Sequence, residues 1–359
     1  MKPAELLQQI VFLDDAGTPR WIDWLGECPG VTVQEIGRSR ADRPLYGLTI
    51  GTGSQLVSLT AGAHADEPAG PMAVCRLVAW LSGNDETAAH LRQTFTFRLC
   101  PQVNPDGAQA NSPWFAPVPD PARYLRHVRR ELPGDDIEFG YPRDGRPALR
   151  PENDAVAQFL ARPGQPYAFH ASLHSMGFAD GAWFLIGQSS VERTTALRQR
   201  LAEHAAAQGF GLHDIQRNGE KGFQRIGRGF CTTPTGAAMR HHFNNAGDPA
   251  TARLFHHSSM EYIQSLGGTP LVMVSEIPNF ALGRSWQPAP VPVQAIDVPP
   301  PAPGSTRYEI FRDALKTRLA TGDIDSALNL ASEYGITPVP FDVHVNLQLD
   351  MVRSALLSL

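Results

Sequence analysis

A strand, a helix and a second strand follow one another early in the chain, and this order constrains the fold more than any other feature of the sequence. Residues 56–61 and 94–100 are largely apolar or β-branched, as buried strands are. Residues 68–81 between them carry apolar side chains at helical spacing and end before a Ser-Gly pair. Two strands joined through a helix form a crossover unit, which predicts an α/β fold.

The rest of the first 286 residues continues this pattern of strands and helices. We expect strands at residues 31–37, 45–50, 168–173, 182–186 and 271–276, and helices at residues 153–161, 191–207 and 258–266. The sequence therefore predicts a mixed central β-sheet flanked by helices, in a catalytic domain that spans residues 1–286.

A proline-rich segment separates this domain from the C-terminal part of the chain. Seven of the 18 residues from 287 to 304 are proline, which excludes a regular helix or a central strand there. We expect an extended linker or a strap over the surface. Residues 305–359 contain three helical patterns, at 307–320, 324–334 and 344–357, and we expect them to form a small helical appendage.

Composition excludes several classes of protein. Apolar residues make up 42% of the chain and the net charge is −5, so a core can form and the basic surface of a nucleic-acid binder is lacking. Four scattered cysteines without a C-x-x-C pair argue against a cysteine zinc site or a disulfide framework. The sequence has neither a long apolar run nor a signal-peptide pattern. We therefore expect no membrane partner and a cytoplasmic location.

His64 and Glu67, in the segment LTAGAHADEPAG, follow an apolar strand at positions i and i+3. In a tight turn or a first helical turn, side chains three residues apart point the same way, so an imidazole and a carboxylate can meet at one ion. Zinc accepts both kinds of ligand and, in catalytic sites, keeps a position open for water. The H-x-x-E spacing alone is common, and a solvated turn is the competing interpretation.

Two further candidates follow apolar strands. His174 lies where the strand at 168–173 gives way to a Ser-Met-Gly turn, and sites in open α/β sheets form outside the carboxyl ends of strands. His170, earlier in that strand, is expected to pack or hydrogen-bond within the sheet. Glu276 ends the strand at 271–276, where a carboxylate beside a metal site is suited to be a general base. The competing interpretation is a strand that has reached the surface.

Together these motifs resemble the zinc carboxypeptidases of the carboxypeptidase A type. The order H-x-x-E, then N-P-D-G, then a strand-end histidine and a strand-end glutamate is the order of that family. The resemblance implies that one zinc ion is held by His64, Glu67 and His174. It also implies that Glu276 activates the attacking water.

One part of the family pattern is changed in this chain. Family members usually carry D-L-N-R-N-F-P, in which Asp supports a zinc-binding histidine and the Asn-Arg pair binds the substrate's terminal carboxylate. The corresponding residues here are Asp136, Glu138 and Phe139. Asp136 can still orient His64, but Glu138 repels a carboxylate and Phe139 lacks an arginine's paired hydrogen bonds. We assign Glu138 and Phe139 to the substrate pocket and expect poor recognition of a free terminal carboxylate.

Arginines elsewhere in the chain could take the two roles that arginine has in this family, which are carboxylate binding and oxyanion stabilisation. Arg240 or Arg284 could replace the lost carboxylate-binding arginine. A second family arginine stabilises the oxyanion, and the region after N-P-D-G offers four candidates: Arg123, Arg126, Arg129 and Arg130. We select Arg123 because its chain spacing is nearest to that of the family.

The segment HADEPAG also resembles the aspartoacylase and succinylglutamate desuccinylase deacylases. The expected function is that of a zinc metallopeptidase acting on a peptide. An N-acyl amino acid deacylase with the same metal chemistry is an alternative, and a non-catalytic scaffold that binds a metal or a peptide is another. The intact ligand set and Glu276 favour an enzyme. The sequence leaves the substrate, exo or endo action and the oligomeric state open.

Overall fold

The computed structural model describes residues 7–359, and within this range ten strands form one mixed sheet. The first six residues, part of the N-terminus that we expect to carry no signal peptide, lie outside the described residues. The strands are β1 (Thr32–Arg38), β2 (Pro44–Ile50), β3 (Gln55–Ala61), β4 (Phe95–Cys100), β5 (Tyr167–Ala179), β6 (Trp183–Ile186), β7 (Arg225–Gly227), β8 (Phe230–Thr232), β9 (Leu271–Ala281) and β10 (Thr337–Pro338).

The sheet is parallel at its centre, and its outer pairs are antiparallel except for the parallel pair of β6 and β8. Its order is β1-β2-β4-β3-β5-β9-β6-β8-β7, and β10 pairs with the end of β9. Parallel ladders join β4, β3, β5 and β9 in turn. The predicted crossover from β3 through a helix to β4 is confirmed, and so is the mixed central sheet.

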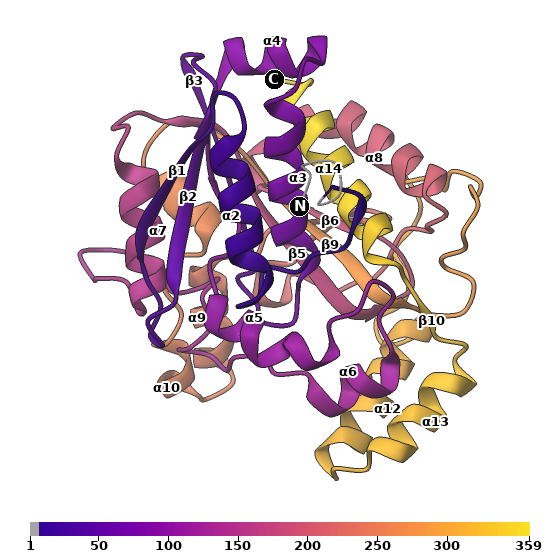
Figure 1. Cartoon of the computed structure of the whole chain (residues 1–359). Coiled ribbons are helices and arrows are strands. Elements are labelled where there is room, and N and C mark those ends of the chain that lie inside the picture. Colours follow the sequence, from indigo (N-terminus) through magenta and orange to yellow (C-terminus); the bar gives the residue numbers. More distant parts are fainter. Residues whose placement is uncertain (1–6) are drawn as a thin grey trace.

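Helices cover both faces of this sheet (Figure 1). They are α2 (Gly17–Glu27), α3 (Ala69–Leu81), α4 (Glu86–Thr94), α5 (Pro105–Asn111), α6 (Pro121–His127), α7 (Pro151–Ala161), α8 (Thr195–Ala207), α9 (Gly236–Asn245), α10 (Pro249–Ala252), α11 (Ser259–Ser265), α12 (Arg307–Ala320), α13 (Ile324–Glu333) and α14 (Phe341–Leu356). None of the helices in the described chain combines the length and apolar character needed to cross a bilayer.

The sheet is buried on both faces because apolar residues point alternately to either side. Along β9, Met273 belongs to the main core, whereas Val272 and Val274 belong to a separate cluster. On the face of the sheet that carries the main core, α3 and α14 pack against β5. On the opposite face, α11 contacts the same strand. The central strands are therefore enclosed, and polar groups at their ends must find partners within the protein.

The strands β5 and β9 are longer than the strands predicted from the sequence at residues 168–173 and 271–276. They continue to Ala179 and Ala281 and stay paired in parallel register over the added length. The Ser-Met-Gly segment is therefore strand and not a turn, and His174 and Glu276 lie within strands and not at strand ends. The expectation was wrong because the inter-strand ladder, which is a tertiary feature, satisfies the backbone groups of these residues.

The proline-rich segment 287–304 forms neither helix nor strand and runs along the surface as a strap. The Val291 N–H donates to the carbonyl of Ala206 in α8. The Gln294 side chain accepts a hydrogen bond of 2.8 Å from the backbone of Leu212. These contacts fasten the segment to the domain at separate points.

All three helices expected after the strap are present. The last one, α14, is part of the main core, where Phe341, Val345 and Val352 are fully buried and the helix packs against α3 and α8. The helices α12 and α13 pack against each other. The division of the chain into residues 1–286, 287–304 and 305–359 stays a prediction.

A histidine inside α14 makes the stability of the fold sensitive to acid. His344 is 0% exposed, and burial lowers its pKa from 6.5 to about 3. Between these two values the unfolded chain binds a proton that the folded chain excludes, so stability is present above pH 6.5 and is lost as the pH falls toward 3. In urea unfolding at several pH values, His344→Leu should reduce the slope across this window by about 1.4 kcal/mol per pH unit. An unchanged slope would contradict this assignment.

Candidate metal centre

The loop between β3 and α3 carries His64 and Glu67 side by side. After Ala61, Gly62 turns the chain with a φ of 70°, and an added Cβ there would lie 2.1 Å from the Gln102 side chain, so only glycine fits. The Glu67 N–H then donates to the carbonyl of His64 over 3.3 Å. This turn brings His64 Nδ1 to 2.8 Å from Glu67 Oε1.

The N-P-D-G segment supports this loop. The Asn104 side chain accepts a hydrogen bond from the Gly107 N–H and donates to the carbonyl of Ala63. Gly107 lies so close to the loop that an added Cβ would be 2.6 Å from the Cβ of Ala65. The segment therefore helps to position the residues on either side of His64.

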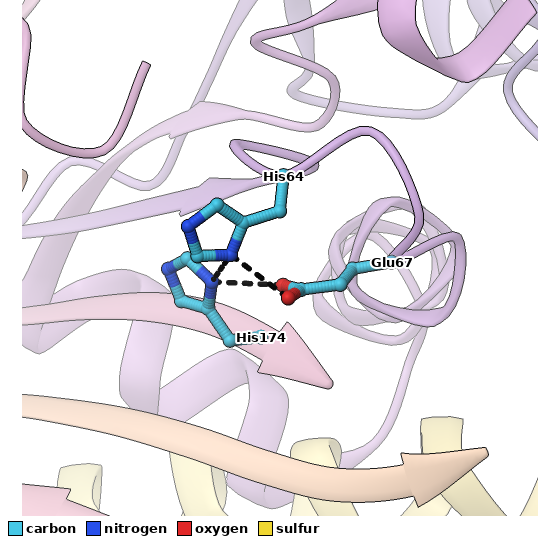
Figure 2. A group of neighbouring side chains, drawn as sticks. All are labelled: His64, Glu67 and His174. Carbon is cyan, nitrogen blue, oxygen red and sulfur yellow. Dashed lines mark hydrogen bonds and ion pairs between the residues drawn. The ribbon is translucent and has the colours of Figure 1, made fainter. Parts of the chain in front are cut away.

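His174 brings a second imidazole to the same point from β5. Its Nδ1 lies 2.8 Å from Glu67 Oε2 and 3.0 Å from His64 Nδ1. Figure 2 shows the three side chains turned toward one another, with the Glu67 carboxylate facing both imidazoles. One possible ligand atom from each residue lies within 4.8 Å of the others. The side chains of Glu67 and His174 are each 2% exposed and that of His64 is 13% exposed, so the cluster opens at His64.

The far nitrogen of each imidazole faces a carboxylate. His174 Nε2 lies 2.9 Å from Glu138 Oε2, and His64 Nε2 lies 3.6 Å from Asp136 Oδ1. A carboxylate in this place favours the tautomer protonated at Nε2 and leaves the Nδ1 lone pair directed into the cluster. Two imidazole nitrogens and one carboxylate directed at one point form a donor set that fits zinc.

The buried carboxylate of Glu67 is held in its charged form by its neighbours. Burial acts to raise its pKa, but the charges and hydrogen bonds of His64 and His174 outweigh burial and keep the pKa well below its usual value. An ionised carboxylate is the form that a metal ion binds.

Glu276 lies on β9 next to His174. The two residues are partners in the parallel ladder, so their side chains leave the sheet on the same face, and Trp183 of β6 is the partner of Glu276 on the other side. Burial raises the pKa of Glu276 to about 8; the Glu67 charge acts in the same direction, whereas the imidazoles and Arg130 oppose it. A carboxyl group with this pKa can exchange a proton near neutral pH.

The arginine at this cluster is Arg130 and not Arg123. Arg130 Nη1 lies 3.2 Å from Glu67 Oε1 and 3.2 Å from Asp66 Oδ1. Arg123 lies on α6, where its guanidinium donates to the carbonyl of Pro113. Chain spacing favours Arg123, but it cannot show that α6 ends before Arg130. In the sequence, the adjacent acids Asp66 and Glu67 are the feature that could have indicated a nearby cation. Both are buried in the fold, and buried carboxylates need a partner of opposite charge.

Two cavities share Arg130 and Glu276 in their walls. The smaller one, about 210 Å³, is lined by His64 and His174 of the candidate metal cluster. Its apolar wall is formed by Phe139, Leu185, Phe223, Pro234, Met239, Met260 and Val274. The larger one, about 440 Å³, is bounded by the end of β5 and by α12, whose residues Tyr308, Phe311, Arg312, Leu315 and Lys316 line it. The C-terminal segment thus contributes one wall of the cleft.

Glu138 and Phe139, both assigned to the substrate from the sequence, have different surroundings. Phe139 lines the smaller cavity and packs edge-on against Phe255, with ring centroids 5.5 Å apart. Glu138 reaches the cavity wall but is 4% exposed, and its two oxygens accept hydrogen bonds from Ser172 and Ser259 as well as facing His174. No sequence pattern links Glu138 to Ser259, which is 121 residues away.

The other residues considered from the sequence lie away from the cluster. Arg240 and Arg284 are not among the described residues that line either cavity, and Arg240 Nη1 donates to the carbonyl of Phe255 over 2.9 Å. His170 is fully buried, with Nδ1 2.9 Å from Ser58 Oγ. The expected hydrogen bond of His170 within the sheet is confirmed.

The sequence of this chain is similar to those of known carboxypeptidases. A family model described as zinc carboxypeptidase matches residues 19–208, about half of the chain, and the match includes His64, Glu67 and His174. Cytosolic carboxypeptidase 6 from Caenorhabditis elegans is 22% identical over 183 residues, which cover 49% of this chain and 37% of that protein. The match therefore spans well under half of that relative's length.

Two solved carboxypeptidase structures align with this chain. A metallo-carboxypeptidase from Burkholderia cenocepacia aligns with a TM-score of 0.51 and 15% identity, over 96% of this chain and 68% of that one. Carboxypeptidase A from Helicoverpa armigera aligns with a TM-score of 0.48 and 16% identity, over 96% of this chain and 74% of that one. At this level of identity the first alignment shows a shared fold.

Proposed function

The chain belongs to the zinc carboxypeptidase family, and from this premise we propose that it is a zinc-dependent metallopeptidase that hydrolyses an amide bond. We assign His64, Glu67 and His174 as ligands of one zinc ion per chain. We assign Glu276 as the general base. The observation that carries the proposal is the convergence of both Nδ1 atoms and the Glu67 carboxylate, with Glu276 on the adjacent strand.

In the proposed reaction, the zinc ion and the side chains of the protein have different roles. Zinc supplies Lewis acidity, which polarises a carbonyl group and acidifies a water molecule. Glu276 accepts a proton from the attacking water and later delivers it to the leaving amine, which returns the carboxylate to its starting state. Its raised pKa, which burial causes, suits a group that must both take and release a proton.

We assign Arg130 to the oxyanion that forms when water attacks the carbonyl. It lines both cavities beside Glu276, so its charge is directed at the space where the reacting group must lie. Asp66 and Glu67 hold the guanidinium in place before substrate arrives. A donor that is already positioned needs little rearrangement during the reaction.

The smaller cavity supports an uncharged or apolar group next to the scissile bond. Among the described residues that line it, Arg130 is the single guanidinium. The other charged residues there, Asp136, Glu138 and Glu276, are carboxylates, and the wall beyond these and the two histidines is apolar. Phe139 stands where the family carries its carboxylate-binding arginine and offers no hydrogen bond. We therefore propose that a free terminal carboxylate is not the feature by which substrate is recognised.

The family implies a peptide substrate, and an N-acyl amino acid is the alternative with the same chemistry. The expected cytoplasmic location stays a prediction.

Glu276→Gln tests the assignment of the base. The amide cannot accept the proton, so kcat/KM should fall by about 10²–10⁴-fold. Zinc binding, measured by competition with a chromophoric chelator, should be retained. His64→Ala is the matched comparison, because it should lose the metal together with activity. Near-normal turnover by the Gln variant would remove Glu276 from the mechanism.

Arg130→Ala and Arg123→Ala distinguish the two candidate arginines. Loss of a positioned oxyanion donor should lower kcat/KM by about 10²–10³-fold in the Arg130 variant, with the larger part of the effect in kcat. The Arg123 variant should stay within about twofold of the wild type, since small surface changes have small effects. The reverse order of the two variants would show that Arg130 has only a structural role.

Matched peptides with a free or an amidated carboxyl terminus test the specificity. The amidated peptide should be hydrolysed at least as fast as the free acid, because the pocket lacks the bidentate arginine. N-acyl amino acids belong in the same panel, and hydrolysis of these alone would favour a deacylase. A clear preference for the free peptide acid would refute the proposed specificity.

A further inference from the structure

Glu138 is the centre of a fully formed hydrogen-bond network behind His174. Its Oε2 lies 2.9 Å from His174 Nε2 and accepts from Ser172 Oγ over 2.9 Å, and Ser172 Oγ itself lies 2.8 Å from His174 Nε2. Its Oε1 accepts from both the backbone N–H and the hydroxyl of Ser259, over 3.1 and 2.8 Å. With 4% of the residue exposed, the carboxylate is committed to these protein groups.

Two of these donors cannot be exchanged for acceptors. The backbone N–H of Ser259 is always a donor. His174 must carry its proton on Nε2 whenever Nδ1 is the ligand, and Nδ1 is the atom that faces Glu67. One oxygen of residue 138 therefore has to accept from the backbone, while the other, together with Ser172 Oγ, faces the imidazole N–H.

A carboxylate satisfies both donors, but an amide cannot. An amide has one oxygen and one NH₂ group, so its NH₂ would face either the Ser259 N–H or the imidazole N–H. Either arrangement sets two donors against each other in a buried place, which costs about 1–3 kcal/mol. The family's asparagine at this position is also one methylene shorter than Glu138.

We propose that Glu138 is a positioning residue for His174, fixing its ring orientation and its Nε2–H tautomer. The inference rests on the proposed function, because it concerns a ligand of the proposed zinc ion. It gives the Asn-to-Glu departure from the family a consequence at the metal rather than at the substrate: the side chain at 138 faces the ligand that binds the metal. With Asp136 near His64, both imidazoles are supported by carboxylates.

The test measures zinc affinity, which does not depend on turnover. Wild type, Glu138→Gln and Glu138→Asn are stripped of metal and titrated with zinc against a chromophoric chelator. Both variants should bind zinc about 10–100-fold more weakly than the wild type, which is the usual effect of losing a carboxylate behind a ligating histidine. The cobalt-substituted variants should also show a changed visible spectrum, because the His174 ring is no longer held.

Glu152→Gln is the matched control. Glu152, on α7, is also buried, and it accepts hydrogen bonds from Arg150 just before that helix and not from the metal cluster. It should lose stability without changing zinc affinity by more than about twofold. Unchanged affinity in Glu138→Gln, or an equal loss in Glu152→Gln, would overturn the inference and leave the proposed function standing. A wild type that binds no zinc would overturn the proposed function itself.

A measurement on the unmodified protein keeps the test valid if the variants do not fold. Nitrogen-15 NMR of the zinc-loaded wild type distinguishes the two imidazole nitrogens of His174. A metal-bound Nδ1 and a protonated, hydrogen-bonded Nε2 would support the inference. A metal-bound Nε2 with the proton on Nδ1 would overturn it, because Glu138 could then not accept a hydrogen bond from the ring.

Discussion

The parallel pairing of β5 with β9 is the constraint on which the site depends. It sets His174 and Glu276 opposite each other in one ladder, so the proposed metal ligand and the proposed general base leave the sheet together without any loop to position them. The loop after β3 then needs to bring only His64 and Glu67 to that point. A change of register by one residue would turn one of the two side chains to the other face of the sheet.

The cluster contains several charged groups, most of them buried, and their arrangement makes this burial tolerable. Arg130 contacts Asp66 and Glu67, Glu67 contacts both imidazoles, and His174 contacts Glu138. Each charged group therefore meets an opposite charge or a donor, which offsets the cost of removing it from water. Such a network is sensitive to single changes, because removal of one member leaves its neighbour buried and unpaired.

The sequence predicted the parts of this molecule that depend on local pattern. Periodicity located β3, α3 and β4 within about one residue, and the H-x-x-E spacing located two members of the cluster. It did not predict the full length of β5 and β9, because each strand is extended by its neighbour. It selected Arg123 over Arg130, since the end of α6 depends on tertiary contacts. It placed Glu138 in the substrate pocket, whose wall Glu138 reaches, but it could not show the contacts of Glu138 with Ser259 and His174, because only the fold brings these residues together.

A crystal structure of the zinc-loaded protein with an anomalous difference map at the zinc edge tests the central claim most directly. We expect one strong peak per chain, at about 2.0–2.2 Å from His64 Nδ1, His174 Nδ1 and a Glu67 oxygen. Glu276 should lie beside the metal without coordinating it. A peak elsewhere in the molecule, or coordination that excludes any of these three side chains, would contradict the account.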